Sequence, residues 1–210
     1  MTERRIVHIV DDEESIRRST SFMLKTSGYT VATFASGVSF LKEVKHLEPG
    51  CILLDIRMPE IDGLQVQQTL IERGIAMPIV FLTGHGDVQT AVTVMKKGAV
   101  ELIEKPFEKS VVLGALDQAF ARLGEQRLKD LRAQEARLLI AGLSTREHEV
   151  LQGLVQGLAN KAIGLDLGIS PRTVEVHRAN LMTKLGVHTL SEALRIAFAA
   201  DLDFTESQDQ

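Results

Sequence analysis

One aspartate follows a run of apolar residues in the manner of a reactive or metal-binding carboxylate. Residues 51–54 are all apolar, Asp55 comes next, and a proline follows at position 59. An uninterrupted apolar run favours a strand that is buried on both faces of a parallel sheet. Asp55 would then lie at the carboxyl end of that strand, where open α/β sheets bind ligands. From this segment alone, a helix-capping or turn aspartate is the open alternative.

Four further residues with suitable chemistry stand at the ends of other predicted strands. Asp11 and Asp12 follow the first strand, and Thr83 and Lys105 each follow a later one. Three neighbouring carboxylates raise one another's pKa values unless a cation lies between them. Oxygen ligands alone suit Mg²⁺, which keeps several waters and accepts a phosphate partner. With a lysine and a hydroxyl donor beside them, these residues supply what a phosphoryl group requires: nucleophile, metal, cation and hydrogen-bond donor.

Strands and helices alternate through the first half of the chain. This alternation predicts a flavodoxin-like, doubly wound sheet of five parallel strands. Right-handed crossovers bring the ends of strands one, three, four and five to one edge, so the residues above should meet there. The expected strands cover residues 6–10, 30–34, 51–55, 79–82 and 100–103, and the expected helices cover residues 15–27, 36–47, 64–72 and 87–97, with a last helix beginning near Lys109.

The composition limits the class of protein. The chain has 210 residues, 24 Lys and Arg, 28 Asp and Glu, and a net charge of −4. This length allows one large or two small domains, and the charge does not by itself indicate a nucleic-acid binder. A single cysteine excludes an internal disulfide, and no apolar run approaches the roughly 20 residues of a membrane span. We therefore expect a cytoplasmic protein with no membrane partner.

The segment between the two halves is predicted to be helical. Leucines recur at helical spacing with charged residues between them, and no proline occurs between Lys109 and Gly142. A flexible linker would instead be rich in Gly, Ser or Pro. We expect a continuous helix from Ser110 onward through the linker at residues 124–141, with Gly114 and Gly124 as its weak points. The leucines approximate a heptad, so a dimeric coiled coil is an open alternative to a single helix.

Four short helices are predicted in the second half, at residues 144–157, 160–167, 171–185 and 190–200. Ser144 and Glu147 have the spacing of a capping box, and Ser170 followed by Pro171 marks the start of the third helix. Short helices joined by a glycine-containing turn have the helix-turn-helix layout, although a generic helical bundle is an alternative. The third helix has a side of short and basic side chains opposite an apolar side, which favours DNA binding.

Together these motifs resemble a known family. In the first half the matching motifs are Val10-Asp11-Asp12-Glu13, Leu54-Asp55-Ile56-Arg57-Met58-Pro59, Thr83-Gly84-His85-Gly86 and Glu104-Lys105-Pro106-Phe107. In the second half they include Asn160-Lys161-x-Ile163, Ile169-Ser170-x-x-Thr173-Val174-x-x-His177 and Lys184-Leu185-Gly186-Val187. The chain is similar to two-component response regulators of the FixJ/NarL family, which join a receiver domain to a LuxR-type DNA-binding domain, and it most resembles the FixJ branch.

The resemblance implies roles for the residues at the edge of the sheet. Asp55 would accept a phosphoryl group from a sensor histidine kinase, and Thr83 and Lys105 would bind the phosphoryl oxygens. The implied ligands of Mg²⁺ are Asp12, Asp55 and the backbone carbonyl of Arg57 directly, and Asp11 through water.

Three further residues bear on how such a site would switch. Leu102 stands where receivers usually carry Tyr or Phe, so the aromatic account of the switch does not transfer directly. Arg57 and His85 lie two positions beyond Asp55 and Thr83. We expect these two side chains to overhang the path of a hydrolytic water and so to tune the lifetime of the acyl phosphate.

In the second half, the resemblance implies that helix 171–185 enters the major groove. We expect Lys161 and Thr173 to contact phosphates, Arg178 to read guanine, and His177 to pack or to contact a phosphate rather than to bind metal. The candidates for base edges are Glu175, Val176, Arg178 and Ala179. The full set of expected DNA-binding residues is Asn160, Lys161, Arg172, Thr173, Glu175, Val176, His177, Arg178 and Lys184.

The expected organisation is a receiver at residues 1–123, a helical linker at 124–141, a helix-turn-helix domain at 142–202 and an acidic tail at 203–210. We expect phosphorylation to expose a dimer face on helix 87–97, strand 100–103 and the last receiver helix. The expected partners are a sensor histidine kinase, double-stranded DNA, a second copy of the chain when phosphorylated, and RNA polymerase. Because each DNA-binding domain is near neutral without its tail, a monomer should bind DNA weakly.

Two other functions use the same residues. A Mg²⁺-dependent phosphotransferase that forms an aspartyl phosphate would need the same carboxylates, but such enzymes usually carry a second Asp where this chain has Arg57. A DNA-binding protein that works without phosphate would retain an intact but little-used acceptor. Beyond phosphotransfer to itself and autodephosphorylation at Asp55, we expect no enzymatic activity.

Overall fold

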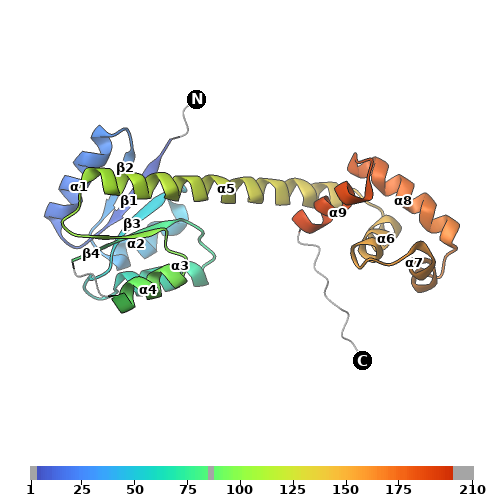
Figure 1. The fold of residues 1–210 in the computed structure, drawn as a ribbon, viewed down its shortest axis with the longest axis horizontal. Coiled ribbons are helices and arrows are strands. Elements are labelled where there is room, and N and C mark those ends of the chain that lie inside the picture. Colours follow the sequence, from blue (N-terminus) through green and yellow to red (C-terminus); the bar gives the residue numbers. More distant parts are fainter. Residues whose placement is uncertain (1–3, 85–87, 201–210) are drawn as a thin grey trace. The chain divides into compact units, whose positions relative to one another are not determined.

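The structure is a computed structural model that describes residues 4–84 and 88–200. The chain forms two compact units, Met1–Glu125 and Gln126–Gln210 (Figure 1). Helix α5 (Lys109–Ala141) crosses the boundary between them without interruption at either Gly114 or Gly124. The predicted continuous helix is therefore confirmed, whereas the pairing of two such helices stays a prediction. His85 and the acidic tail at 203–210 lie outside the described residues.

The first unit contains the predicted parallel sheet. Its strands are β1 (Ile6–Val10), β2 (Thr30–Phe34), β3 (Cys51–Asp55), β4 (Ile79–Thr83) and β5 (Glu101–Glu104). All pairs are parallel and the order is β2-β1-β3-β4-β5, so β1, β3 and β4 are central. Every residue of these three strands is buried, as expected for strands covered on both faces.

Helices cover the two faces of this sheet with separate cores. They are α1 (Glu14–Thr26), α2 (Gly37–Glu43), α3 (Gly63–Glu72) and α4 (Val88–Lys96), together with the first part of α5. Phe40 of α2 and Leu70 of α3 pack on one face, and Leu24 of α1 and Leu116 of α5 pack on the other. The helix expected over residues 36–47 is shorter, because α2 ends at Glu43 and tightens into a 3₁₀ turn (Val44–His46).

The end of β3 is held in place by the start of α3. Asp62 and Gln65 form a capping box at the start of that helix. A Cβ atom on Gly63 would lie 2.4 Å from the backbone oxygen of Asp55. Only glycine permits this approach, so the first turn of α3 lies directly against the residue that carries the candidate nucleophile.

The C-terminal end of α4 is anchored to α3. The buried amide of Gln67 donates through Nε2 to the backbone oxygens of Val94 (3.3 Å) and Lys97 (3.4 Å). Lys97 Nζ donates to Gln68 Oε1 at 3.1 Å. Val94 is itself fully buried in the core between α4 and the sheet. Carbonyls that end a helix are thus satisfied by a side chain from its neighbour.

The second unit has the four predicted short helices, α6 (Thr145–Val155), α7 (Asn160–Leu167), α8 (Pro171–Leu185) and α9 (Leu190–Ala199). The capping box of Ser144 and Glu147 is confirmed, as is the start of α8 with Ser170 as N-cap and proline next. The core of this unit includes the end of α5, through Ala136 and Ile140. Among the described residues, no helix is both long and apolar enough to cross a membrane.

Candidate functional site

The strand ends of the first unit bring three carboxylates together. Asp11 and Asp12 follow β1 and Asp55 ends β3, and each offers an oxygen within 4.8 Å of those of the other two. Asp11 and Asp55 are buried, whereas Asp12 is exposed. The order of the strands explains the cluster, because β1 and β3 are neighbours and their carboxyl ends point the same way.

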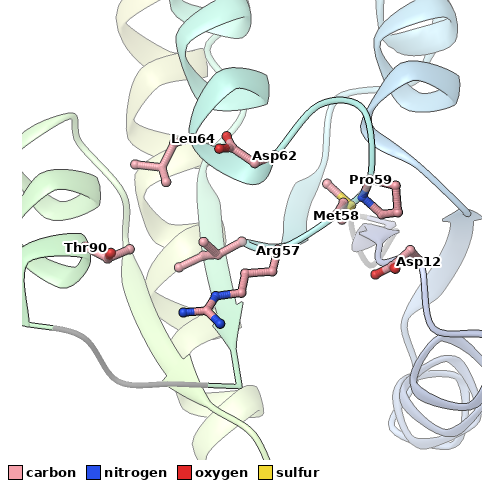
Figure 2. Close-up of a pocket in the computed structure, with 8 residues that line it drawn as sticks. Asp12, Arg57, Met58, Pro59, Asp62, Leu64 and Thr90 are labelled. Carbon is pink, nitrogen blue, oxygen red and sulfur yellow. The ribbon is translucent and has the colours of Figure 1, made fainter.

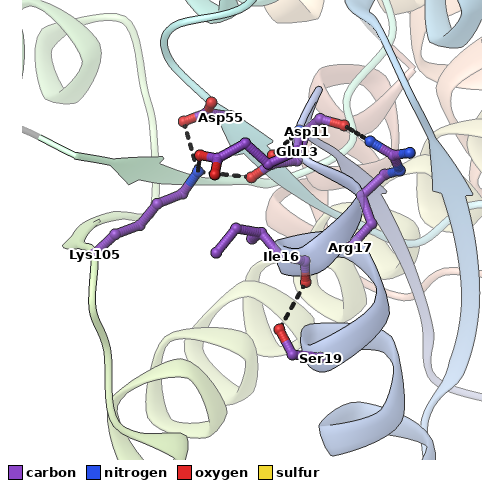
Figure 3. Close-up of polar contacts among 7 residues, drawn as sticks. All are labelled: Asp11, Glu13, Ile16, Arg17, Ser19, Asp55 and Lys105. Carbon is purple, nitrogen blue, oxygen red and sulfur yellow. Dashed lines mark hydrogen bonds and ion pairs between the residues drawn. The ribbon is translucent and has the colours of Figure 1, made fainter.

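Lys105 reaches into this cluster from the end of β5 (Figure 3). Its Nζ lies 2.7 Å from Asp11 Oδ2, 3.2 Å from Asp55 Oδ1 and 3.8 Å from Glu13 Oε1. Only 11% of the lysine side chain is exposed. Thr83 is buried at the end of β4, and its backbone oxygen accepts a hydrogen bond from Lys105 N at 2.7 Å. The five chemically suitable residues of the sequence thus share one edge of the sheet.

Burial governs the electrostatics of this edge. The pKa of Asp55 is raised to about 6, chiefly because burial disfavours its charged form; the charge of Lys105 opposes this rise and the charge of Asp11 adds to it. Burial lowers the pKa of Lys105, but its contacts with Asp11 and Asp55 outweigh that effect and raise it overall. Three carboxylates against one ammonium leave an excess of negative charge. An oxygen-only donor set with this excess fits a hard divalent cation such as Mg²⁺.

We expect Asp55→Asn to stabilise the cation-free first unit at neutral pH. The Asp55 carboxyl binds a proton more tightly when folded, with a pKa of about 6 against 3.8. Its ionisation therefore costs stability as the pH rises through this window, by about 3 kcal/mol in total. The advantage of the asparagine variant should be absent near pH 3.8 and complete above the folded pKa.

Tyrosine fluorescence can measure this difference, because the chain has one tyrosine and no tryptophan. Tyr29 lies in the first unit and stacks on Phe120 with ring centroids 5.9 Å apart, so its signal reports unfolding of this unit. Urea titrations with a chelator would give the unfolding free energy at each pH. Parallel pH profiles for the wild type and the variant would contradict the expectation.

A pocket of about 580 Å³ adjoins the carboxylates (Figure 2). Its lining residues are Asp12, Ile56, Arg57, Met58, Pro59, Asp62, Leu64 and Thr90. Arg57 is exposed and follows β3 by two residues, so its side chain is available beside Asp55. Leu102 in β5 is partly buried and packs against the core that contains Val94 of α4. The structure therefore places Arg57 beside the pocket and packs Leu102 against this core.

The second unit presents an exposed face on α8. Val174, Leu181 and Leu185 face the core of this unit. The exposed residues of α8 include Arg172, Glu175, Val176, Ala179 and Lys184, while Thr173 and His177 are half-buried. Val176 is 54% exposed, so its methyl groups are available for contact with a thymine methyl group. Lys161 is exposed on α7, the helix that precedes α8.

Two basic residues expected to face DNA have protein partners. Arg178 is half-buried, and its Nη1 donates to Asn160 Oδ1 at 2.6 Å. Lys184 Nζ lies 2.7 Å from Glu147 Oε2, which also accepts from Ser144 N at 2.7 Å. Sequence reasoning missed both pairs, because their members are 18 and 37 residues apart and belong to different helices.

We expect Lys184→Ala to lower the melting temperature of the second unit by several degrees. The hydrogen bond from Lys184, together with that from Ser144 N, lowers the pKa of Glu147 to about 2. The stabilisation that accompanies this lowered pKa is fully present above pH 4.5, the pKa of the unfolded chain. It is lost as the pH falls toward the lower pKa of the folded protein.

Far-UV circular dichroism would measure the change in melting temperature, with Lys161→Ala as the control. A reduced salt dependence of DNA binding without a change in melting would instead identify Lys184 as a phosphate contact.

Comparisons with known proteins agree with both units. A response regulator receiver domain model matches residues 7–117, and the model for bacterial regulatory proteins of the luxR family matches residues 141–197. The transcriptional regulatory protein FixJ of Azorhizobium caulinodans is 46% identical over 200 residues, covering 95% of each chain. FixJ of Rhizobium meliloti is 44% identical over 193 residues, covering 92% of this chain and 95% of that one.

This chain belongs to the FixJ family of response regulators. Solved structures with the same two-domain organisation include the response regulator StyR, with a TM-score of 0.75 and 37% identity over 93% of this chain and 98% of that one. Full-length FixJ from B. japonicum has a TM-score of 0.59 and 38% identity, covering 96% of this chain and 100% of that one.

Membership in the FixJ family confirms the fold class and the general function predicted from the sequence. The chain is a transcriptional regulator that joins a receiver to a LuxR-type DNA-binding domain, and phosphorylation and DNA binding are the mechanism of its family. A receiver implies a sensor kinase as partner, and the LuxR-type domain implies DNA. The chain thus belongs to a family of transcriptional regulators, and not to the Mg²⁺-dependent phosphotransferases considered as an alternative.

Proposed function

We propose that Asp55 is the phosphoacceptor of this regulator. The observation that carries the proposal is the meeting of Asp11, Asp12, Asp55 and Lys105 at one sheet edge. An Asp55 oxygen would attack the phosphorus of a phosphohistidine, the P–N bond would break, and the imidazole would leave with its electron pair. Lys105 already contacts Asp55, so its ammonium would lie within reach of the new phosphoryl oxygens, with the Thr83 hydroxyl as a second donor.

The acidic residues would hold Mg²⁺ during this transfer. Asp12, Asp55 and the backbone carbonyl of Arg57 would bind it directly, and Asp11 would act through water. When bound, the ion neutralises the charges of the carboxylates and of the incoming phosphoryl group. Asp11 is also bonded to Lys105 and accepts from Glu13 N at 2.8 Å, which holds its carboxylate toward the site.

Arg57 would tune the lifetime of the acyl phosphate, as would His85. Arg57 is exposed beside the pocket next to Asp55, where it can obstruct a hydrolytic water. We expect Arg57→Ala to change the rate at which phosphate is lost from the purified phosphoprotein, which phosphate-affinity gels would measure. An unchanged rate in both the Arg57→Ala and His85→Ala proteins would contradict this role.

Phosphorylation would act by pairing two weak DNA-binding domains. We propose that the dimer face comprises α4, β5 and the receiver part of α5. Val88, Val92 and Met95 of α4 are exposed apolar side chains, which support this choice. Leu128, Leu131 and Leu138 of α5 are exposed as well and would supply the contacts of a coiled coil. Analytical ultracentrifugation of residues 105–142 on a monomeric carrier tests the coiled coil, and a strict monomer would exclude it.

The remaining assignments follow from this scheme. Residues 1–123 would receive the signal, residues 124–141 would transmit it, and residues 142–202 would bind DNA. The DNA-bound dimer would contact RNA polymerase. The protein would act in the cytoplasm, which contains both the chromosome and the kinase domain. Arg172, Thr173 and Lys161 would contact phosphates beside the exposed face of α8, and His177 would contribute packing.

Mass spectrometry and DNA binding together test the proposed function. The wild-type chain, treated with acetyl phosphate and Mg²⁺, should gain one phosphate at residue 55 and bind its promoter DNA more tightly. Tight binding without phosphorylation would instead favour a DNA-binding protein that works independently of phosphate. No added phosphate at residue 55 would remove the basis of the proposal.

A further inference from the structure

Arg178 does not share the exposed face of the recognition helix. Successive α-helical residues are about 100° apart, so Arg178 lies about 40° from Val174 and about 160° from Val176. Val174 is fully buried, whereas Val176 is 54% exposed. Arg178 also stands three residues before the fully buried Leu181, on the stripe that packs against the core. The helical phase therefore directs Arg178 toward the rest of the domain.

The partner of Arg178 is the first residue of α7. Asn160 Oδ1 accepts a hydrogen bond of 2.6 Å from Arg178 Nη1, and both side chains are half-buried. A charged donor makes such a bond shorter and stronger than a neutral one. The residue before Asn160 is Ala159, the N-cap, whose side chain makes no capping hydrogen bond. The bond joins the start of α7 to the middle of α8.

We propose that the Asn160–Arg178 hydrogen bond positions the recognition helix, and that Arg178 reads no base. Base preference would come from the exposed face of α8, chiefly from Glu175 and Val176. Asn160 would act through Arg178 by fixing the orientation of α8 against α7. This inference rests on the proposed function, because it concerns how the same DNA-binding surface is held.

A binding experiment with the phosphodonor-treated full-length chain separates positioning from reading. The wild type would first select its preferred sites from random duplex DNA, and its affinity for every single-base variant of the best site would then be measured. Arg178→Met and Asn160→Ala should each weaken binding about tenfold for all of these duplexes alike. Base preference should be unchanged, and the double variant should bind no more weakly than either single one.

Two controls sharpen the comparison. Asn160→Asp keeps the accepting oxygen but adds a negative charge, so it should recover part of the affinity that Asn160→Ala loses, whereas Val176→Ala should alter the preference at one base pair. Loss of a guanine preference in Arg178→Met, with unchanged binding by Asn160→Ala, would overturn the proposal. Circular dichroism would verify folding, and Asn160→Ala serves as the test if Arg178→Met unfolds. If the wild type selects its sites equally well without a phosphodonor, the proposed function fails while the comparison among these variants stands.

Discussion

Asp55→Asn is expected to abolish the gain in DNA affinity that a phosphodonor gives to the wild-type chain. An asparagine amide cannot form an acyl phosphate, so the receivers would not pair. Joining two weak DNA-binding domains raises the apparent affinity by roughly 10²–10⁴-fold when both reach their half-sites. The whole of this gain should be missing in the variant, while the weak binding of the monomer remains.

Mobility shifts and sedimentation with and without acetyl phosphate would measure this loss. Glu13→Gln is a matched control, because it removes the same charge from an exposed carboxylate 3.8 Å from Lys105 Nζ. The control should still dimerise and bind. Phosphodonor-induced dimers of Asp55→Asn would show that the signal enters the receiver elsewhere.

A second large effect is expected from Gly164→Ala in α7. A Cβ atom at this position would lie 2.7 Å from the backbone oxygen of Ile169 and 3.4 Å from the backbone nitrogen of Pro171. These backbone atoms belong to the turn after α7 and to the first residue of α8, so the turn or the start of α8 would have to move. We expect a destabilisation of about 1–3 kcal/mol and at least a tenfold loss of DNA affinity, because α8 would leave its place.

Gly124→Ala provides the comparison, since it adds the same methyl group within helix α5, where the new Cβ atom would meet no atom within 4 Å outside the helix's own backbone. That variant should be as stable as the wild type or up to about 1 kcal/mol more stable. Calorimetry and fluorescence anisotropy on labelled DNA would measure both quantities. Wild-type affinity in Gly164→Ala would mean that the turn tolerates a shift without moving α8.

Periodicity and strand order made the receiver predictable. The apolar run that ends at Asp55 favoured a buried strand, and the alternation of strands with helices then placed Asp11, Thr83 and Lys105 at the same edge. The contact of Lys105 with both Asp11 and Asp55 could not be predicted from the sequence. The strand order places the backbone of Lys105 at this edge, but it does not give the position of the ammonium group. The early end of α2 was also not evident from the apolar pattern.

The polar contacts of the second unit were not predictable in the same way. The composition of α8 identified it as a recognition helix, yet Arg178 and Lys184 were interpreted by charge alone. The position of Arg178 between Val174 and Leu181 on the helix could have indicated that it faces the core, but which residue it then contacts depends on the packing angles between helices. Asn160 and Glu147, their partners, lie on other helices and carry no signal of the pairing in sequence.

Gln67 limits how far the C-terminal end of α4 can move. The Gln67 amide donates hydrogen bonds to backbone carbonyls at the C-terminal end of that helix, where Val94 is fully buried in the core. The N-terminal end of α4 is the exposed Val88, which follows Thr83 by five residues in the chain. Because the C-terminal end of α4 is held in this way, we expect a displacement of the helix that starts beside Thr83 to move Val88 farther than Val94.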